Sequence, residues 1–233
     1  MFFITIKQVK FKKNDTALQP IFLYLKNYIM NKLFALFVFS SLLFVSISFK
    51  KPVDAAIGNF KLKSTTNQFI ALSDYKTAKG FMIVFICNKC PMANLYTNRL
   101  NTLNLKYKNK GFPLLVINSM DTLVYAEESF ILMQKKAKKG KFNFPYLQDK
   151  DQKLAKKFNA THTPQAFVIK KNKLGKYDIK YQGAIDDNAG EENLATPNLD
   201  NAVNELVQGK NVSKAVTESF GCRIFFRGEK YKM

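Results

Sequence analysis

The chain has 233 residues, 22 of them phenylalanine, and a formal charge of +20 at pH 7. This length predicts one or two domains with a sizeable apolar core, and three cysteines are too few for a disulfide framework. The excess of lysine would suit nucleic acid or anionic lipid, but no nucleic-acid motif accompanies it, so we predict no nucleic-acid partner.

The N-terminal part of the chain has the anatomy of a secretory signal peptide. Met30 begins a short basic stretch, and a mostly apolar run follows at residues 33–47. We therefore interpret Met30 as the true start, residues 1–51 as an extension with a signal peptide, and residues 52–233 as one domain. The run is short for a membrane span, which needs about 20 residues, yet an uncleaved membrane anchor stays an alternative. Either way we predict export, to the periplasm or to a membrane-anchored position facing outside the cytoplasm.

The domain begins with two alternating segments, residues 60–63 and 69–72, which predict a β-hairpin. Continuous apolar runs at 81–86 and 112–117 predict buried strands. Between them a helical pattern follows Cys90 and ends at Gly111. Strand, helix and strand over this length predict two parallel central strands.

The second half of the domain alternates short helices and strands. We predict helices at 125–139, 149–158 and 199–207, and strands at 144–147, 165–169 and 177–182. The lysine run at 135–141 is interpreted as a solvated helix end. The acidic loop at 184–198 is interpreted as solvated rather than as a calcium site; its acidic residues are Asp186, Asp187, Glu191 and Glu192.

A Cys-x-x-Cys pair, Cys87 and Cys90, lies where a buried strand turns into a helix. Unpaired N–H groups at such a junction favour a thiolate, and Lys89 adds a cation. This arrangement predicts a redox dithiol whose disulfide, Cys87–Cys90, is the working group with no other cofactor. We predict that Cys87 is the nucleophile and that Cys90 resolves the mixed disulfide.

Four segments resemble one family: residues 58–74, 84–91, 181–187 and 221–224. In this order they are similar to the AhpC/TSA redoxin family, in the peroxiredoxin-like branch that retains Cys-x-x-Cys. The resemblance implies an α/β, thioredoxin-like fold, with a central mixed β-sheet flanked by helices and an N-terminal β-hairpin. It also implies a cis bond before Pro164 that faces the dithiol, with Thr163 offering its backbone to a partner peptide. Lys89 stands where the family often has His, so the effect of that family residue on the thiolate carries over only loosely to this chain.

Cys222 lies in the Gly-Cys-x-Ile segment of the same resemblance. It could act as a second resolving thiol, pair between chains, or pack without a redox role. As an additional redox thiol it would join Cys87 and Cys90.

The sequence leaves several functions open. The first is thiol–disulfide exchange with protein disulfides or dithiols, with an unknown redox partner. The second is a peroxiredoxin-like thiol peroxidase acting on peroxide through Cys90, although Cys87 then replaces the usual hydroxyl residue. A third is a copper or other metal chaperone that uses both cysteines and His162. A redox-inactive binding module on the same scaffold is the non-enzymatic alternative.

Overall fold

The computed structural model describes residues 56–229. The predicted signal segment and the boundary at residue 51 lie outside the described residues. Within the described range, none of the helices is both long and apolar enough to cross a bilayer.

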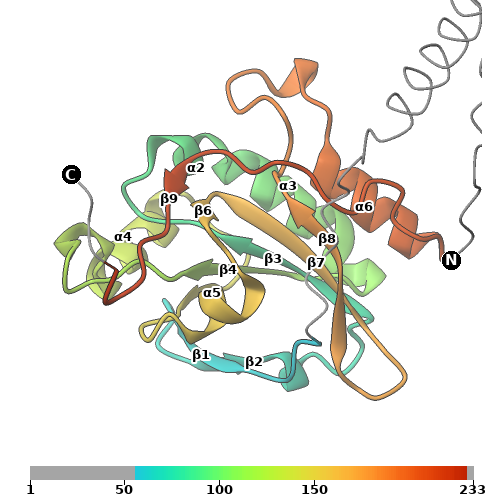
Figure 1. The fold of residues 1–233 in the computed structure, drawn as a ribbon, viewed down its shortest axis with the longest axis horizontal. Coiled ribbons are helices and arrows are strands. Elements are labelled where there is room, and N and C mark those ends of the chain that lie inside the picture. The colour runs from blue at the N-terminus through green and yellow to red at the C-terminus, as the bar shows by residue number, and fades with distance from the viewer. Residues whose placement is uncertain (1–55, 230–233) are drawn as a thin grey trace, which may run out of the picture. The chain divides into compact units, whose positions relative to one another are not determined.

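Seven strands form one mixed sheet in the order β2-β1-β5-β4-β3-β7-β8 (Figure 1). β3, β4 and β5 are mutually parallel, whereas β7 runs antiparallel to β3 and β8 antiparallel to β7. The predicted N-terminal hairpin is confirmed as β1 and β2, which extend the sheet beyond β5. The strands are β1 Lys61–Ser64, β2 Phe69–Ala71, β3 Gly80–Phe85, β4 Leu114–Asn118, β5 Tyr146–Gln148, β7 Gln165–Lys171 and β8 Tyr177–Gly183.

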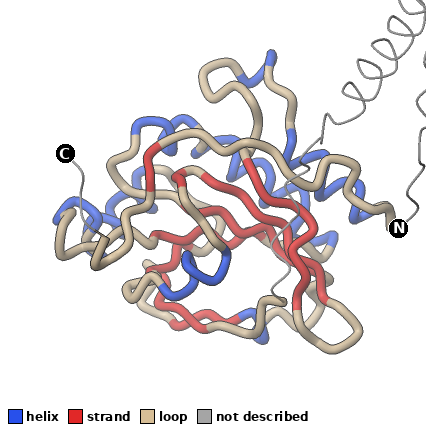
Figure 2. The backbone as a smooth tube through the Cα atoms, viewed as in Figure 1, coloured by secondary structure: helices blue, strands red, loops and turns tan. Residues whose placement is uncertain are grey.

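Helices flank this sheet, and Figure 2 shows the strands running between them. α5 lies in front of the sheet in Figure 1, whereas α3 lies behind it. The helices are α2 Pro91–Leu95, α3 Thr97–Tyr107, α4 Phe130–Lys139, α5 Lys153–Phe158 and α6 Asn198–Val207. Short 3-10 turns are η1 Leu72–Asp74, η2 Lys108–Lys110, η3 Ala126–Glu128 and η4 Glu192–Leu194.

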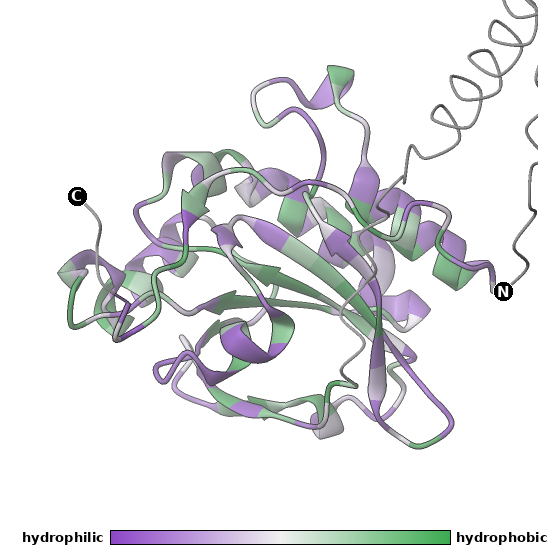
Figure 3. Cartoon of the chain, viewed as in Figure 1, coloured by the Kyte–Doolittle hydropathy of each residue, from purple (hydrophilic) through white to green (hydrophobic). Residues whose placement is uncertain are grey.

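The core forms around the two central strands. Every residue of β3 and of β4 is buried, as their unbroken apolar sequences predict (Figure 3). Gly80 is required at the start of β3, because a Cβ there would lie 2.2 Å from the carbonyl oxygen of Ile169. This strand is therefore packed on both faces, and it presents its carboxyl end as a fixed platform for the residues that follow.

Three helices differ from the sequence predictions. The helix after the cysteines is divided at Tyr96 into α2 and α3. The helix predicted at 125–139 begins only at Phe130, after the turn η3. The helix predicted at 149–158 begins at Lys153, because Asp149 lies outside it and accepts hydrogen bonds from the backbone N–H groups of Leu154 and Ala155.

A separate two-stranded sheet pairs β6, His162–Thr163, with β9, Cys222–Arg223. Figure 1 shows the red C-terminal strand β9 beside β6, close to α2. The C-terminal segment thus returns to the region where the Cys-x-x-Cys pair lies.

Candidate functional site

The pairing of β3 with β7 brings the dithiol close to the proline segment, residues 162–164, which directly precedes β7. Phe85 pairs with Gln165, so the residues that follow β3 lie beside those that precede β7. The Thr163–Pro164 peptide bond is cis, as the resemblance implied. The hydroxyl of Thr163 lies 3.1 Å from Cys87 Sγ, and its carbonyl oxygen accepts a hydrogen bond from Cys90 Sγ at 3.3 Å. The predicted residues Cys87, Cys90, Thr163 and Pro164 therefore form one site.

Cys90 is the centre of a cluster of three thiols. The neighbouring thiols of Cys87 and Cys222 lower the pKa of Cys90 to about 4, against the opposing effect of burial. Cys90 precedes Pro91, the first residue of α2, so it faces N–H groups that no helical carbonyl occupies. These surroundings favour the thiolate form at Cys90 over the other two cysteines.

Cys87 has the opposite electrostatic environment. Its hydrogen bond to Cys90 and its burial raise the pKa of the Cys87 thiol, and the charge of Glu128 adds to this. The side chain is only 2% exposed. The assignment of Cys87 as the nucleophile stays a prediction, and the structure favours Cys90 as the thiolate.

Glu128 holds the turn between the two cysteines. Its buried carboxylate accepts hydrogen bonds from the backbone N–H groups of Asn88, at 2.6 Å, and of Lys89, at 3.1 Å. It also accepts one from the side-chain amide of Asn118 at the end of β4. The carboxylate thereby fixes the cysteine turn to the central sheet.

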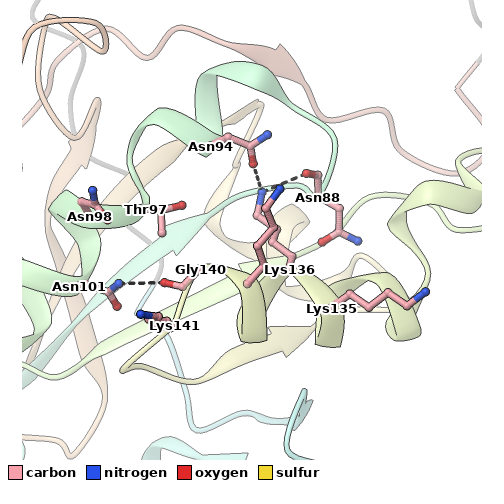
Figure 4. A pocket seen from close by; sticks show the side chains of 10 residues that line it. Asn88, Asn94, Thr97, Asn98, Asn101, Lys135, Lys136, Gly140 and Lys141 are labelled. Carbon is pink, nitrogen blue, oxygen red and sulfur yellow. Dashed lines mark hydrogen bonds between the residues drawn. The ribbon is translucent and has the colours of Figure 1, made fainter.

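The two lysines near the site differ in position. Lys89, expected to support the thiolate, instead pairs with Glu127 at 3.1 Å, and its side chain is 75% exposed. Lys136 from α4 donates to the backbone carbonyls of Cys87 and Asn88, both at 3.0 Å, and to the side chain of Asn94 (Figure 4). Lys136 is therefore the cation that contacts the cysteine turn. Lys136 thus departs from the interpretation of its lysine run as a solvated helix end, whereas Lys135, Lys138, Lys139 and Lys141 are exposed as predicted.

Lys136 forms part of the wall of an open cavity of about 650 Å³. Other lysines on the same wall are Lys135, Lys139 and Lys141. Burial lowers the pKa of Lys136, while the nearby Cys87 and Glu128 oppose that effect. The ammonium group thus bridges α4 to the turn that carries the thiols.

Replacing Lys136 with methionine should lower the free energy of unfolding by about 2 kcal/mol, because two backbone carbonyls and one amide lose a charged donor. Chemical denaturation of the reduced protein measures this change. Lys135→Met is the matched control, since Lys135 is exposed on the same helix. Equal destabilisation by the two substitutions would show that the bonds of Lys136 contribute nothing specific.

Cys222, in the C-terminal strand β9, lies next to the dithiol although it is 132 residues from Cys90 in the sequence. Its Sγ lies 2.8 Å from Cys90 Sγ, and unlike the other two cysteines its residue is exposed. Burial and the hydrogen bond to Cys90 raise the pKa of Cys222 to about 11. The sequence offered a resolving, intermolecular or packing role for this residue, and the structure places its sulfur against the other two.

His162 precedes this site without joining the thiols. Its Nδ1 lies 2.9 Å from the hydroxyl of Thr161. Across residues 56–229, no group of three His, Cys, Asp or Glu side chains is arranged to hold a metal ion. The geometry gives the metal-chaperone alternative no support.

The acidic loop is more buried than expected at Asp186. This carboxylate binds Arg99 at 2.6 Å and accepts a hydrogen bond from the hydroxyl of Tyr96 at 2.7 Å. Both side chains of the Asp186–Arg99 pair are at most 8% exposed. Asp186 therefore anchors the loop to the helix behind the cysteines, contrary to the solvated interpretation of this residue.

Sequence reasoning missed Glu128 and Lys136 as supports of the site. The sequence did contain a weak signal for Lys136. The helical period places it one turn after Met133, on the same face of the helix, and Met133 is buried in the core. No local signal marks Glu128, whose partners in the cysteine turn are 39 and 40 residues away.

Comparison with known proteins agrees with this architecture. The AhpC/TSA family model matches residues 53–177. A hypothetical protein from Sinorhizobium meliloti is 26% identical with a TM-score of 0.68, over 78% of this chain and 98% of that one. An uncharacterized conserved protein from Geobacillus kaustophilus is 28% identical with a TM-score of 0.68, over 77% of this chain and 94% of that one.

The thioredoxin domain of a thiol-disulfide oxidoreductase from Bacteroides vulgatus shares the fold at 15% identity. Its TM-score is 0.50, over 68% of this chain and 99% of that one. No curated protein matches the chain. The fold is thioredoxin-like, and because the family model covers more than half of the sequence, the chain belongs to the AhpC/TSA family.

Proposed function

We propose that this protein is a thiol–disulfide oxidoreductase that works through Cys87 and Cys90. The observation that carries the proposal is the position of both thiols beside the cis Thr163–Pro164 bond, where Cys87 Sγ lies 3.1 Å from the Thr163 hydroxyl and Cys90 Sγ donates to the Thr163 carbonyl. The lowered pKa of Cys90 adds to it. A stabilised thiolate favours the reduced dithiol, which makes the corresponding disulfide a better oxidant. The preferred direction is therefore oxidation of partner dithiols.

A partner thiolate attacks the enzyme disulfide, one enzyme sulfur forms the mixed disulfide, and Cys90 leaves as a thiolate. The second partner thiol then attacks the mixed disulfide, so the partner becomes a disulfide and the enzyme a dithiol. A thiol of low pKa is a good leaving group, and Cys90 fits that role. The proposed partners are protein dithiols outside the cytoplasm, since we propose that residues 33–47 direct export.

A second candidate function is peroxide reduction at Cys90. The feature that favours it is the same thiolate with two thiols in contact. Attack on peroxide would give a sulfenic acid and release hydroxide or alcohol. Condensation with a neighbouring thiol would then form a disulfide and release water. Against this reading, Cys87 stands where a peroxidase would place a hydroxyl that positions the peroxide.

One preparation distinguishes the two functions. The reduced protein is mixed with glutathione redox buffer, and separately with hydrogen peroxide, and its disulfide content is followed by acid quenching and mass spectrometry. We expect reversible equilibration with glutathione and a peroxide reaction no faster than that of free cysteine. Rapid peroxide consumption that requires Cys90 would instead establish the peroxidase and overturn exchange as the main activity.

A further inference from the structure

The C-terminal strand occupies the edge of the proline segment. β9 pairs antiparallel with β6, with Thr163 opposite Cys222 and His162 opposite Arg223. The N–H of Ile224 also donates to the carbonyl of Thr161 at 2.8 Å. An extended partner peptide would use the same backbone groups to add a strand. The position expected for an external peptide is thus filled by the protein's own chain.

This segment is built into the fold rather than laid on its surface. Ile224 is only 1% exposed, and the side chain of Gln152 hydrogen bonds the backbone at Phe225 and Arg227, at 2.8 and 2.7 Å. The Arg227 guanidinium binds both carboxylate oxygens of Asp121. These contacts fix the register of β9 from its C-terminal side.

Gly221 fixes the register from the N-terminal side. Its φ is +130°, and a Cβ there would lie 2.3 Å from the carbonyl oxygen of Thr163. Only glycine allows the chain to approach so closely. The residue directly before Cys222 therefore determines how near its sulfur comes to Cys90.

The three cysteine residues differ in their exposure to solvent. Cys87 and Cys90 are 2% and 3% exposed, whereas Cys222 is exposed. Cys222 Sγ lies 2.8 Å from Cys90 Sγ, so exchange with a Cys87–Cys90 disulfide could join these two sulfurs, at a bond length of about 2.05 Å, with little movement of the backbone. Of the three cysteines, the one whose residue is exposed is already in contact with the buried Cys90.

We infer that β9 is a built-in partner strand and that Cys222 is the sulfur through which the buried dithiol exchanges with external thiols and disulfides. The inference rests on the proposed exchange function. The thiolate of Cys222 attacks Cys90 in the Cys87–Cys90 disulfide. The Cys90–Cys222 bond forms, the Cys87–Cys90 bond breaks, and Cys87 takes up the proton that Cys222 released. Electrons are redistributed without net oxidation.

An external thiolate then attacks the sulfur of Cys222, the exposed residue of the three, and expels Cys90. Cys90 is the thiol of lowest pKa in the cluster, and attack that expels such a thiol is fast. Burial and the Cys90 anion raise the pKa of Cys222 in the reduced cluster. The contribution of the anion disappears once Cys90 is part of a disulfide, so the oxidised cluster is the state in which Cys222 can attack.

The test compares glutathione exchange in the full protein and three variants. Cys222→Ser removes the relay sulfur, and Gly221→Ala keeps the sulfur but displaces it. Gly209→Ala is the matched control, because Gly209 also has a positive φ, of +78°, but a Cβ there meets no atom within 4 Å. Circular dichroism checks folding, and quenched samples are mapped by mass spectrometry.

We expect a Cys90–Cys222 disulfide to appear during exchange by the wild type. Exchange by Cys222→Ser and Gly221→Ala should be slower by about tenfold or more, and Gly209→Ala should match the wild type. Wild-type rates in Cys222→Ser would overturn the inference while leaving the exchange function in place. Absence of exchange in the wild type would overturn the function itself. If Gly221→Ala does not fold, Cys222→Ser decides alone, because its side chain is exposed.

Discussion

Replacing Cys90 with serine is expected to slow thiol–disulfide exchange by about 100-fold or more, because the remaining thiols lack a stabilised anion. Cys87 is buried with a raised pKa, and Cys222 has a pKa of about 11 in the intact cluster. Neither is the favoured leaving group that Cys90 provides. Equilibration with glutathione redox buffer near neutral pH, quenched with acid, measures the loss.

Cys87→Ser is the matched comparison for this prediction. Its hydroxyl can still donate to Cys90, so the thiolate persists, and Cys90 can still form a disulfide with Cys222 although Cys87–Cys90 can no longer form. The ultraviolet absorbance of the thiolate should disappear only as the pH falls through the Cys90 pKa of about 4, in wild type and in Cys87→Ser alike. In Cys90→Ser it should appear only at alkaline pH. Exchange by Cys90→Ser at the wild-type rate would show that the thiolate at this position is not needed.

Replacing Asp186 with asparagine is expected to lower the free energy of unfolding by about 3–5 kcal/mol, the cost of breaking a buried ion pair from one side. Arg99 would keep its bonds to the carbonyls of Asn188 and Ala189. Its guanidinium would then be buried with only Glu192 as a charged partner, whose side chain is 62% exposed. Urea unfolding measures the loss, and the slope of the free energy of unfolding against urea concentration should stay unchanged.

Asp187→Asn is the control, since the neighbouring carboxylate is exposed and accepts a hydrogen bond from the backbone N–H of Thr196. An asparagine oxygen can accept the same bond, so little stability should be lost. Equal losses from the two substitutions would mean that the Asp186–Arg99 pair is not what ties the acidic loop to α3.

The sequence was sufficient to predict the central architecture because that part of the fold is encoded locally. The unbroken apolar runs predicted β3 and β4, and the hairpin alternation predicted β1 and β2. The Cys-x-x-Cys pair and its position after a buried strand were also visible. The cis bond at Pro164 came from the family resemblance, since the local sequence of Thr163 and Pro164 would suit an ordinary turn.

Other features depend on contacts between distant residues. The helix is divided at Tyr96 although no proline or glycine is present there, and the hydroxyl of Tyr96 binds Asp186, 90 residues later. Lys89 is next to the cysteines in sequence but pairs with Glu127, while Lys136 reaches the same turn from another helix. Sequence proximity was therefore a poor guide to which cation contacts the site.

The separation of Cys90 and Cys222 by 132 residues has a consequence for the unfolded chain. A Cys90–Cys222 bond would close a long loop and remove much of the entropy of the unfolded state, stabilising the fold by up to about 4–5 kcal/mol. A Cys87–Cys90 bond spans three residues and would restrict the unfolded chain far less. Moving the disulfide from the inner pair to the C-terminal strand would therefore switch the domain between a less and a more stable form, with no change in its total number of disulfides.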